Sequence, residues 1–293
     1  MTYIAPASRL PMSVSTFSRL RARPWICAAA LLLAAPAANA DLMLFPTRIV
    51  FEKNQRAAQL ELINQGKTPE TYRLSLVNRR MSETGEFAPA DTPAPGEQFA
   101  DEMVRFSPRQ VTIAPGSSQT VRMLLRKPEN LAAGEYRSHL QIDRVADPVG
   151  SGSIEAAPDN GGNIGVTLTA LVGASIPVIV RQGETGATVA LTQLALVPAG
   201  AEPASIAFEI DRSGNRSVYG DLIVTFIPKS GAPIEVARAG GVAVYVPNAL
   251  RRARMPLRTP EGTMLSGGTL RLSFRERADA GGKLLAEATL GLP

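Results

Sequence analysis

The side chains that most often act as nucleophiles, bases or metal ligands are scarce in this chain. Its 293 residues include one histidine, His139, and one cysteine, Cys27. A Ser-His-Asp triad would have to use His139, and a single histidine is too few for a histidine zinc site. His139 lies in the alternating stretch 136–142, which favours a structural histidine on a strand. With no G-x-x-x-x-G-K-[ST] loop and no G-x-S-x-G elbow, the sequence predicts no enzyme, no metal and no cofactor.

The charged residues do not form a recognisable site either. The formal charge is +5, but four arginines and no acid lie in residues 1–40, which leaves 27 basic and 26 acidic residues in the remainder. Nucleic-acid binding depends on clustered Lys and Arg, so a nearly neutral chain argues against it. Arg251, Arg252 and Arg254 make a short basic cluster that is typical of a solvated turn.

Residues 1–40 have the pattern of a secretory signal peptide. Arginines precede a short apolar core at residues 25–33, and Ala38-Asn39-Ala40 matches an A-x-A cleavage site. The apolar core is too short for a membrane span. We expect cleavage after Ala40, which also removes Cys27 and so leaves an exported chain without disulfides. The bacterial periplasm suits such a protein, and full secretion is the alternative.

The remaining sequence reads as strands. Apolar and polar residues alternate between Pro and Gly punctuation, and no long stretch shows a helical period. The expected strands are residues 56–64, 72–77, 111–113, 121–125, 136–142 and 164–181, then 189–197, 205–210, 220–227, 241–246, 269–275 and 284–290. Strands at this spacing predict an all-β chain built from β-sandwiches of immunoglobulin type.

Breaks in this rhythm suggest the domain organisation. Gln182-Gly183-Glu184 looks like a hinge, so we predict one sandwich domain at 41–182 and a second at 183–293. Two longer stretches rich in Pro or Gly interrupt the first domain, at 82–103 and 146–163. Loops of this length are functional segments or tolerated surface insertions.

Several motifs resemble the PapD-like periplasmic chaperones of pilus assembly. The matching segments are PTRIVF at 46–51, residues 60–64, FSPRQVTIAPG at 106–116 with QTVR at 119–122, GEYR at 134–137 and SIPVIVR at 175–181. In order and spacing they cover nearly all of 41–181, and GNRS at 214–217 is a shorter match in the second half. The resemblance implies two immunoglobulin-like domains set at an angle.

The resemblance also implies a task and partners. Such chaperones bind unfinished pilus (fimbrial) subunits, here called clients, and deliver them to an outer-membrane usher. A client lacks one strand of its sandwich, and the chaperone lends an edge strand whose alternating side chains fill the exposed groove. The apolar face that would be lent consists of Ile164, Val166, Leu168, Ala170 and Val172. The same edge strand could also pair with a second copy of the chain.

Three further residues take roles from the resemblance. Arg48 matches the arginine that anchors the client's terminal carboxylate, whereas Pro177 stands where the family has a second cation, a lysine. A bidentate arginine can bind a carboxylate alone. Glu135 and Arg181 match an acid and an arginine of an interdomain salt bridge, and antiparallel neighbours would bring them together. The third member of that bridge has no clear counterpart, and Glu261 is a guess.

Two other function classes remain open at this point. A secreted structural or adhesive sandwich protein, including one that binds carbohydrate, would share the fold. It is disfavoured because the single Trp, Trp25, lies in the cleaved segment and aromatic faces usually stack on sugars. An exported hydrolase lacks a nucleophile paired with a base.

Overall fold

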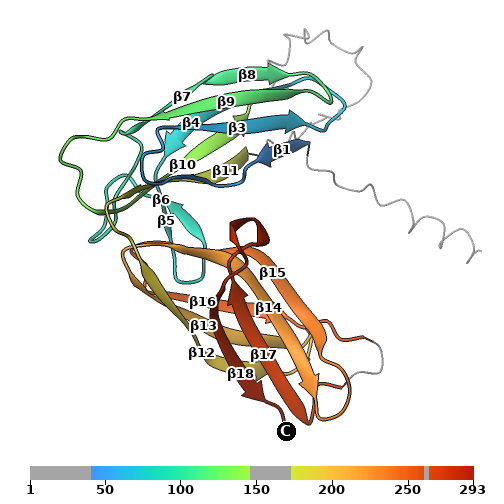
Figure 1. Cartoon of the computed structure of the whole chain (residues 1–293). Helices are drawn as coiled ribbons and strands as arrows, with labels where there is room; N and C mark the ends of the chain where they lie inside the picture. The colour runs from blue at the N-terminus through green and yellow to red at the C-terminus, as the bar shows by residue number, and fades with distance from the viewer. Residues whose placement is uncertain (1–40, 146–172, 261–263) are drawn as a thin grey trace, which may run out of the picture. The chain divides into compact units, whose positions relative to one another are not determined.

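The computed structural model describes residues 41–145, 173–260 and 264–293. Within these ranges the chain forms strands and a single short 3-10 helix, Ala278–Ala280, and no helix is long and apolar enough to cross a membrane. The strands build two sandwiches, which confirms the prediction of an all-β chain with two immunoglobulin-like folds (Figure 1). The angle between the sandwiches and the domain boundary stay predictions.

Two sheets make the first sandwich. One has the order β1-β3-β9-β7, with β1 at Leu42–Phe45, β3 at Ala57–Asn64, β9 at Ser118–Leu125 and β7 at Val104–Ser107. The other has the order β2-β11-β10-β4-β8, with β2 at Ile49–Phe51, β11 at Gly173–Gln182, β10 at Gly134–Arg144, β4 at Glu70–Val77 and β8 at Gln110–Ile113. The chain leaves one sheet after β1 and joins the other at β2, so residues 46–48 form the crossing between them.

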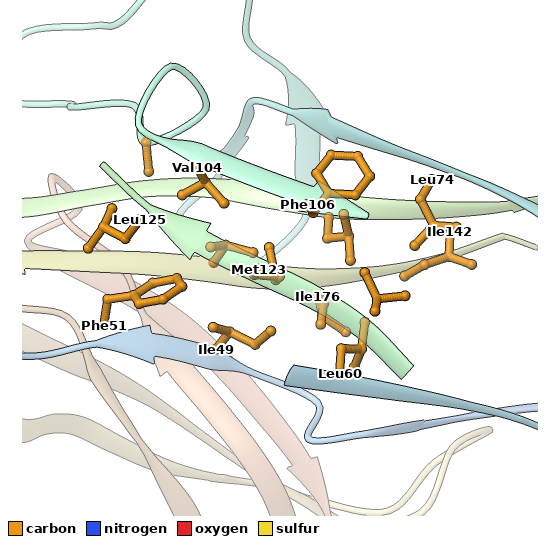
Figure 2. Close-up of a cluster of buried hydrophobic side chains, with 14 of the residues drawn as sticks. Ile49, Phe51, Leu60, Leu74, Val104, Phe106, Met123, Leu125, Ile142 and Ile176 are labelled. Atoms are coloured by element: carbon orange, nitrogen blue, oxygen red, sulfur yellow. The ribbon is translucent and has the colours of Figure 1, made fainter. Parts of the chain in front are cut away.

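The core of the first sandwich follows from the alternation of its strands. On β9, Val121, Met123 and Leu125 are buried while the residues between them are exposed. Figure 2 shows Met123 and Leu60 from one sheet facing Ile142 and Ile176 from the other. Apolar surface removed from water in this way contributes about 25 cal/mol per Å².

The second sandwich is built from longer strands. One sheet has the order β12-β13-β16, with β12 at Ala187–Val197, β13 at Ser205–Gly214 and β16 at Leu250–Pro256. The other has the order β15-β14-β17-β18, with β15 at Ile234–Val244, β14 at Val218–Pro228, β17 at Gly268–Arg275 and β18 at Leu284–Gly291. Its apolar core also includes two buried residues that precede the second sandwich in the sequence, Met81 and Ile179.

A small hairpin links the first half of the chain to the second sandwich. It consists of β5 (Arg79–Met81) and β6 (Phe87–Pro89), which lie in and beside the stretch expected to be a loop. Asn248 Nδ2 donates to the carbonyl oxygen of Met81 at 2.9 Å, and the backbone N–H of Arg252 donates to that of Glu83 at 2.7 Å. These bonds fasten the hairpin to β16 and the turn before it.

The basic cluster of the second half is not a solvated turn as expected. Arg251, Arg252 and Arg254 lie on strand β16, which pairs with β13. Arg252 forms salt bridges with Glu83 of the hairpin and with Glu209. The aliphatic part of an arginine side chain can cover apolar surface while its charged end forms a salt bridge. An analysis based on alternating apolar residues therefore did not predict this strand.

Candidate functional site

The structure brings the predicted pair Glu135 and Arg181 together. They lie directly opposite each other on the antiparallel strands β10 and β11. Arg181 Nε donates to Glu135 Oε2 at 3.0 Å, and the two side chains are 9% and 1% exposed. A buried ion pair needs further hydrogen bonds to offset its desolvation, so its other partners matter.

The second sandwich completes this network with a serine. The backbone N–H of Ser217 donates to Glu135 Oε2 at 3.2 Å, and its hydroxyl donates to Oε1. Arg181 also binds Glu52, which lies 3.7 Å from Arg216 Nη2. Ser217 therefore provides the contact that the resemblance assigned to an acid, and Glu261 lies outside the described residues.

Arg48 is in a different electrostatic position. It precedes β2 directly, at the crossing between the sheets. Its guanidinium lies over the ring of Tyr219, 4.7 Å from the centroid, and 5.6 Å from that of Tyr245. Its Nη1 is buried and has no hydrogen-bond partner among the described residues. Burial lowers the pKa of Arg48 from its ordinary value, although an arginine remains protonated in proteins.

A cavity of about 280 Å³ lies beside Arg48. Its lining residues are Thr47, Arg48, Arg79, Phe87, His139, Ser175, Pro177, Tyr219, Gly241 and Tyr245. Pro177, which the resemblance aligns with a lysine, therefore lines the same cavity as Arg48. No Asp or Glu is among these lining residues, so the part of the chain that the structure describes places two arginine charges here without an acid.

His139 lines this cavity with an uncharged imidazole ring. It is 3% exposed and stacks edge-on against Phe87 with a centroid distance of 5.1 Å. Burial, followed by the nearby charges of Arg137 and Arg79, lowers the pKa of His139 to about 3. The imidazole therefore adds no positive charge near neutral pH, and within the described ranges no group of His, Cys, Asp and Glu could hold a metal ion.

The predicted lending face cannot be followed in the structure. Ile164, Val166, Leu168, Ala170 and Val172 all lie outside the described residues. Strand β11, which covers the described part of the stretch 164–181 that the sequence predicted as a strand, pairs along its whole length with β10. On its other side it pairs with β2 only at residues 178–180. Among the described residues, the edge of β11 at 173–177 therefore has no strand beside it.

Sequence reasoning missed several residues of this region. Arg79 and Tyr245 carry no local signal, because their importance comes from contacts between distant parts of the chain. Ser217 and Tyr219 lie at or just after the GNRS segment at 214–217, which was the weak match in the second half. That short motif was the available clue to the contact with Glu135.

Comparisons with solved structures found several that are similar to this chain. The chain is similar to the structure of a CsuC–CsuE chaperone–tip subunit complex from archaic chaperone-usher pili of Acinetobacter baumannii, at 12% identity and a TM-score of 0.44 over 87% of this chain and 100% of the other. It is also similar to the Pseudomonas aeruginosa CupB2 chaperone, at 14% identity and a TM-score of 0.41 over 85% and 98%. The fold resembles that of pilus chaperones.

A third similar structure is that of the Salmonella enterica SafA pilin in complex with the SafB chaperone, at 14% identity and a TM-score of 0.40 over 87% and 97% of the two chains. No protein-family model matches this chain, and no curated protein matches it in sequence. At such low identity the likeness concerns the fold, so we base the function on the residues of this chain.

Proposed function

We propose that this protein is a non-enzymatic periplasmic chaperone that binds pilus subunits by lending them an edge strand and delivers them to an outer-membrane usher. The observation that carries the proposal is the unpartnered, buried N–H group of Arg48 in a cavity beside the open edge of β11. These two features supply an anchor and a strand for one client chain.

The open edge of β11 supports strand lending. Residues 173–177 have backbone groups with no ladder partner on one side among the described residues. An added client strand would satisfy those groups, as in β-strand addition to an exposed edge. Ile176, Val178 and Val180 of β11 face the first core, and in the sequence the predicted lending residues have the same parity. A client's groove would then continue the apolar face that fills the chaperone's own sandwich.

Arg48 supports carboxylate anchoring. A buried N–H donor without an acceptor destabilises the free protein by about 1–3 kcal/mol. A client carboxylate that accepts this hydrogen bond would remove that cost, and this would favour binding. A chain-terminal carboxylate presents two oxygens in the plane that a guanidinium fork matches. Anchoring one end of the client would also fix the register of its strand against β11.

A capture experiment tests the lending strand. The tagged protein is co-expressed in the periplasm with a candidate pilus subunit, and the complex is purified through the tag. Leu168→Arg should leave the protein folded and abolish capture, because an unpaired charge cannot enter an apolar groove without a cost of several kcal/mol. Leu124→Arg is the matched control, since Leu124 is 60% exposed on β9 and is not on the lending strand. Normal capture by Leu168→Arg would show that the lending face is wrong.

The same capture assay tests the role of Arg48, and the mass of the exported protein tests the signal peptide. Arg48→Ala should weaken capture by the worth of a charge-assisted bond, about 1.5–3 kcal/mol, and spare the melting temperature. A large fall in melting temperature with unchanged capture would make Arg48 structural. The mass of the protein recovered from the periplasm should correspond to cleavage after Ala40, and a mass that includes residues 1–40 would contradict the signal peptide.

A further inference from the structure

Arg79, like Arg48, has a buried N–H group without a hydrogen-bond acceptor among the described residues. It stands at the start of the hairpin strand β5 and lines the same cavity of about 280 Å³. Its Nη2 donates to Gln141 Oε1 at 2.8 Å, but its Nε is buried without a partner in the described part of the chain. Gln141 is neutral, so the charge of Arg79 is not compensated by this bond.

Arg137, the arginine that contacts Arg79, differs from it in having an acid within salt-bridge distance. Its Nη2 donates to the Arg79 carbonyl oxygen at 3.0 Å and lies 3.8 Å from Glu97 Oε1, whereas its Nη1 has no hydrogen-bond partner in the described chain. Glu97 also binds Arg80. Among the described residues, no salt bridge within 4.0 Å reaches Arg48 or Arg79, so the cavity has two positive charges and no negative one. An anion is the ligand that this arrangement lacks.

We propose that Arg79 is the second cation of the carboxylate pocket, so that the β5–β6 hairpin, rather than the lending strand, completes the clamp on the client's chain terminus. This inference rests on the proposed function for the identity of the ligand. Pro177 on β11 lies opposite His139 on β10, and both line the cavity. The cation missing at Pro177 is therefore supplied across the cavity by Arg79.

The walls of the cavity favour a carboxylate on a peptide over a free inorganic anion. Phe87, Tyr219 and Tyr245 present aromatic surface to it. Burial raises the pKa of Tyr245, which keeps its hydroxyl neutral and able to donate. Aromatic walls bury the apolar part of a terminal residue while the arginine forks hold its planar carboxylate.

Fixation of the hairpin gives Arg79 a defined position. Its strand β5 continues to Met81, which is 3% exposed in the second core and accepts a hydrogen bond from Asn248. A site held on packed elements keeps its geometry better than one on a free loop. The pocket therefore depends on the contact between the hairpin and the second sandwich.

The test is a titration of the exported protein with N-acetylglycine, followed by the NMR signals of the arginine Nε–H groups. N-acetylglycinamide, which lacks the carboxylate, is the matched ligand. The signals of Arg48 and Arg79, assigned with Arg48→Lys and Arg79→Lys, should shift with the acid and not with the amide. Arg79→Gln should weaken binding about tenfold or more, the loss expected for one charge-assisted hydrogen bond. Arg73→Gln, an exposed arginine on β4, should leave binding unchanged.

Each other outcome has a defined meaning. Absence of shifts up to the solubility limit, or unchanged binding in Arg79→Gln, overturns the inference, and tighter binding of inorganic phosphate overturns the choice of a carboxylate. If broad changes in the amide spectrum show that Arg79→Gln disturbs the fold, the wild-type titration and the Arg79→Lys variant are used instead. Because Arg79→Lys retains the charge, it should still bind the acid, and loss of binding in a folded Arg79→Lys together with no wild-type shift at Arg79 overturns the inference. If Arg48→Gln loses probe and client while Arg79→Gln keeps both, the role of Arg79 fails and the proposed function stands. If both variants lose the probe but capture the client normally, Arg79 belongs to a carboxylate site and the anchoring function fails.

Discussion

Glu135 and Arg48 are charged residues near the contact between the two sandwiches, the first buried and the second half-buried, and their surroundings differ. Glu135 receives Arg181, the Ser217 hydroxyl and the Ser217 backbone N–H. Arg48 has aromatic rings beside it and one N–H group without a partner in the described chain. A charged side chain whose hydrogen bonds are all made within the protein stabilises the fold. One that has an N–H group without an acceptor can still bind a ligand. Changes to these two sites should therefore affect stability with opposite sign.

The largest effect is expected at Glu135. Glu135→Gln should lower the free energy of unfolding by about 3–5 kcal/mol, because it removes the buried partner of Arg181 and leaves this buried cation with only the half-exposed Glu52 as counter-charge. Urea unfolding measures this, and a loss below about 1 kcal/mol would show that the network is no stronger than a surface pair.

The next effect concerns His139 and pH. Its folded pKa of about 3 lies below the ordinary value of 6.5, so the unfolded chain binds the proton more tightly. The contribution is complete above pH 6.5 and is lost as pH falls toward 3. Between about pH 8 and about pH 5 the wild type should lose about 2 kcal/mol more than His139→Gln. Urea titrations at both pH values check this, and equal losses would contradict a buried, neutral imidazole.

A smaller effect of opposite sign is expected at Arg48. Arg48→Met keeps most of the apolar stem and removes the unpaired charge. The free energy of unfolding should stay unchanged or rise by up to about 1 kcal/mol, because the desolvation cost that is relieved offsets the lost contact with the Tyr219 ring. Thermal and urea unfolding measure it. A loss above about 1 kcal/mol would place Arg48 with Glu135 as a structural charge.

The smallest effect on stability is expected at an exposed salt bridge, which serves as a reference for the buried sites. Glu235 and Arg238 form a salt bridge at 2.7 Å on β15 with side chains 46% and 53% exposed. Glu235→Gln should change the free energy of unfolding by less than about 0.5 kcal/mol, since exposed pairs are screened by water and salt. A loss comparable to that of Glu135→Gln would mean that burial is not what separates the sites.

Period-2 patterning was enough to predict most of the strands and the fold class. It failed where a strand is short or charged: β5 and β6 have three residues each, and β16 carries three arginines. Arg48, Glu135 and Arg181 came from the resemblance to pilus chaperones. Arg79 and Tyr245 could not be found this way, because a cavity forms from residues whose closeness depends on the packing of both sandwiches. The lending face stays a prediction.

Residues 178–181 of strand β11 are buried on both faces of the strand, and this limits how the molecule can be divided. Val178 and Val180 pack in the first core, while Ile179 between them packs in the second and is fully buried. A fragment that ends at residue 182 would expose Ile179 and Met81 to water as a new apolar patch. Each half would then be prone to self-association when expressed alone. Replacing either sandwich with that of another protein would therefore require matching residues at positions 81 and 179.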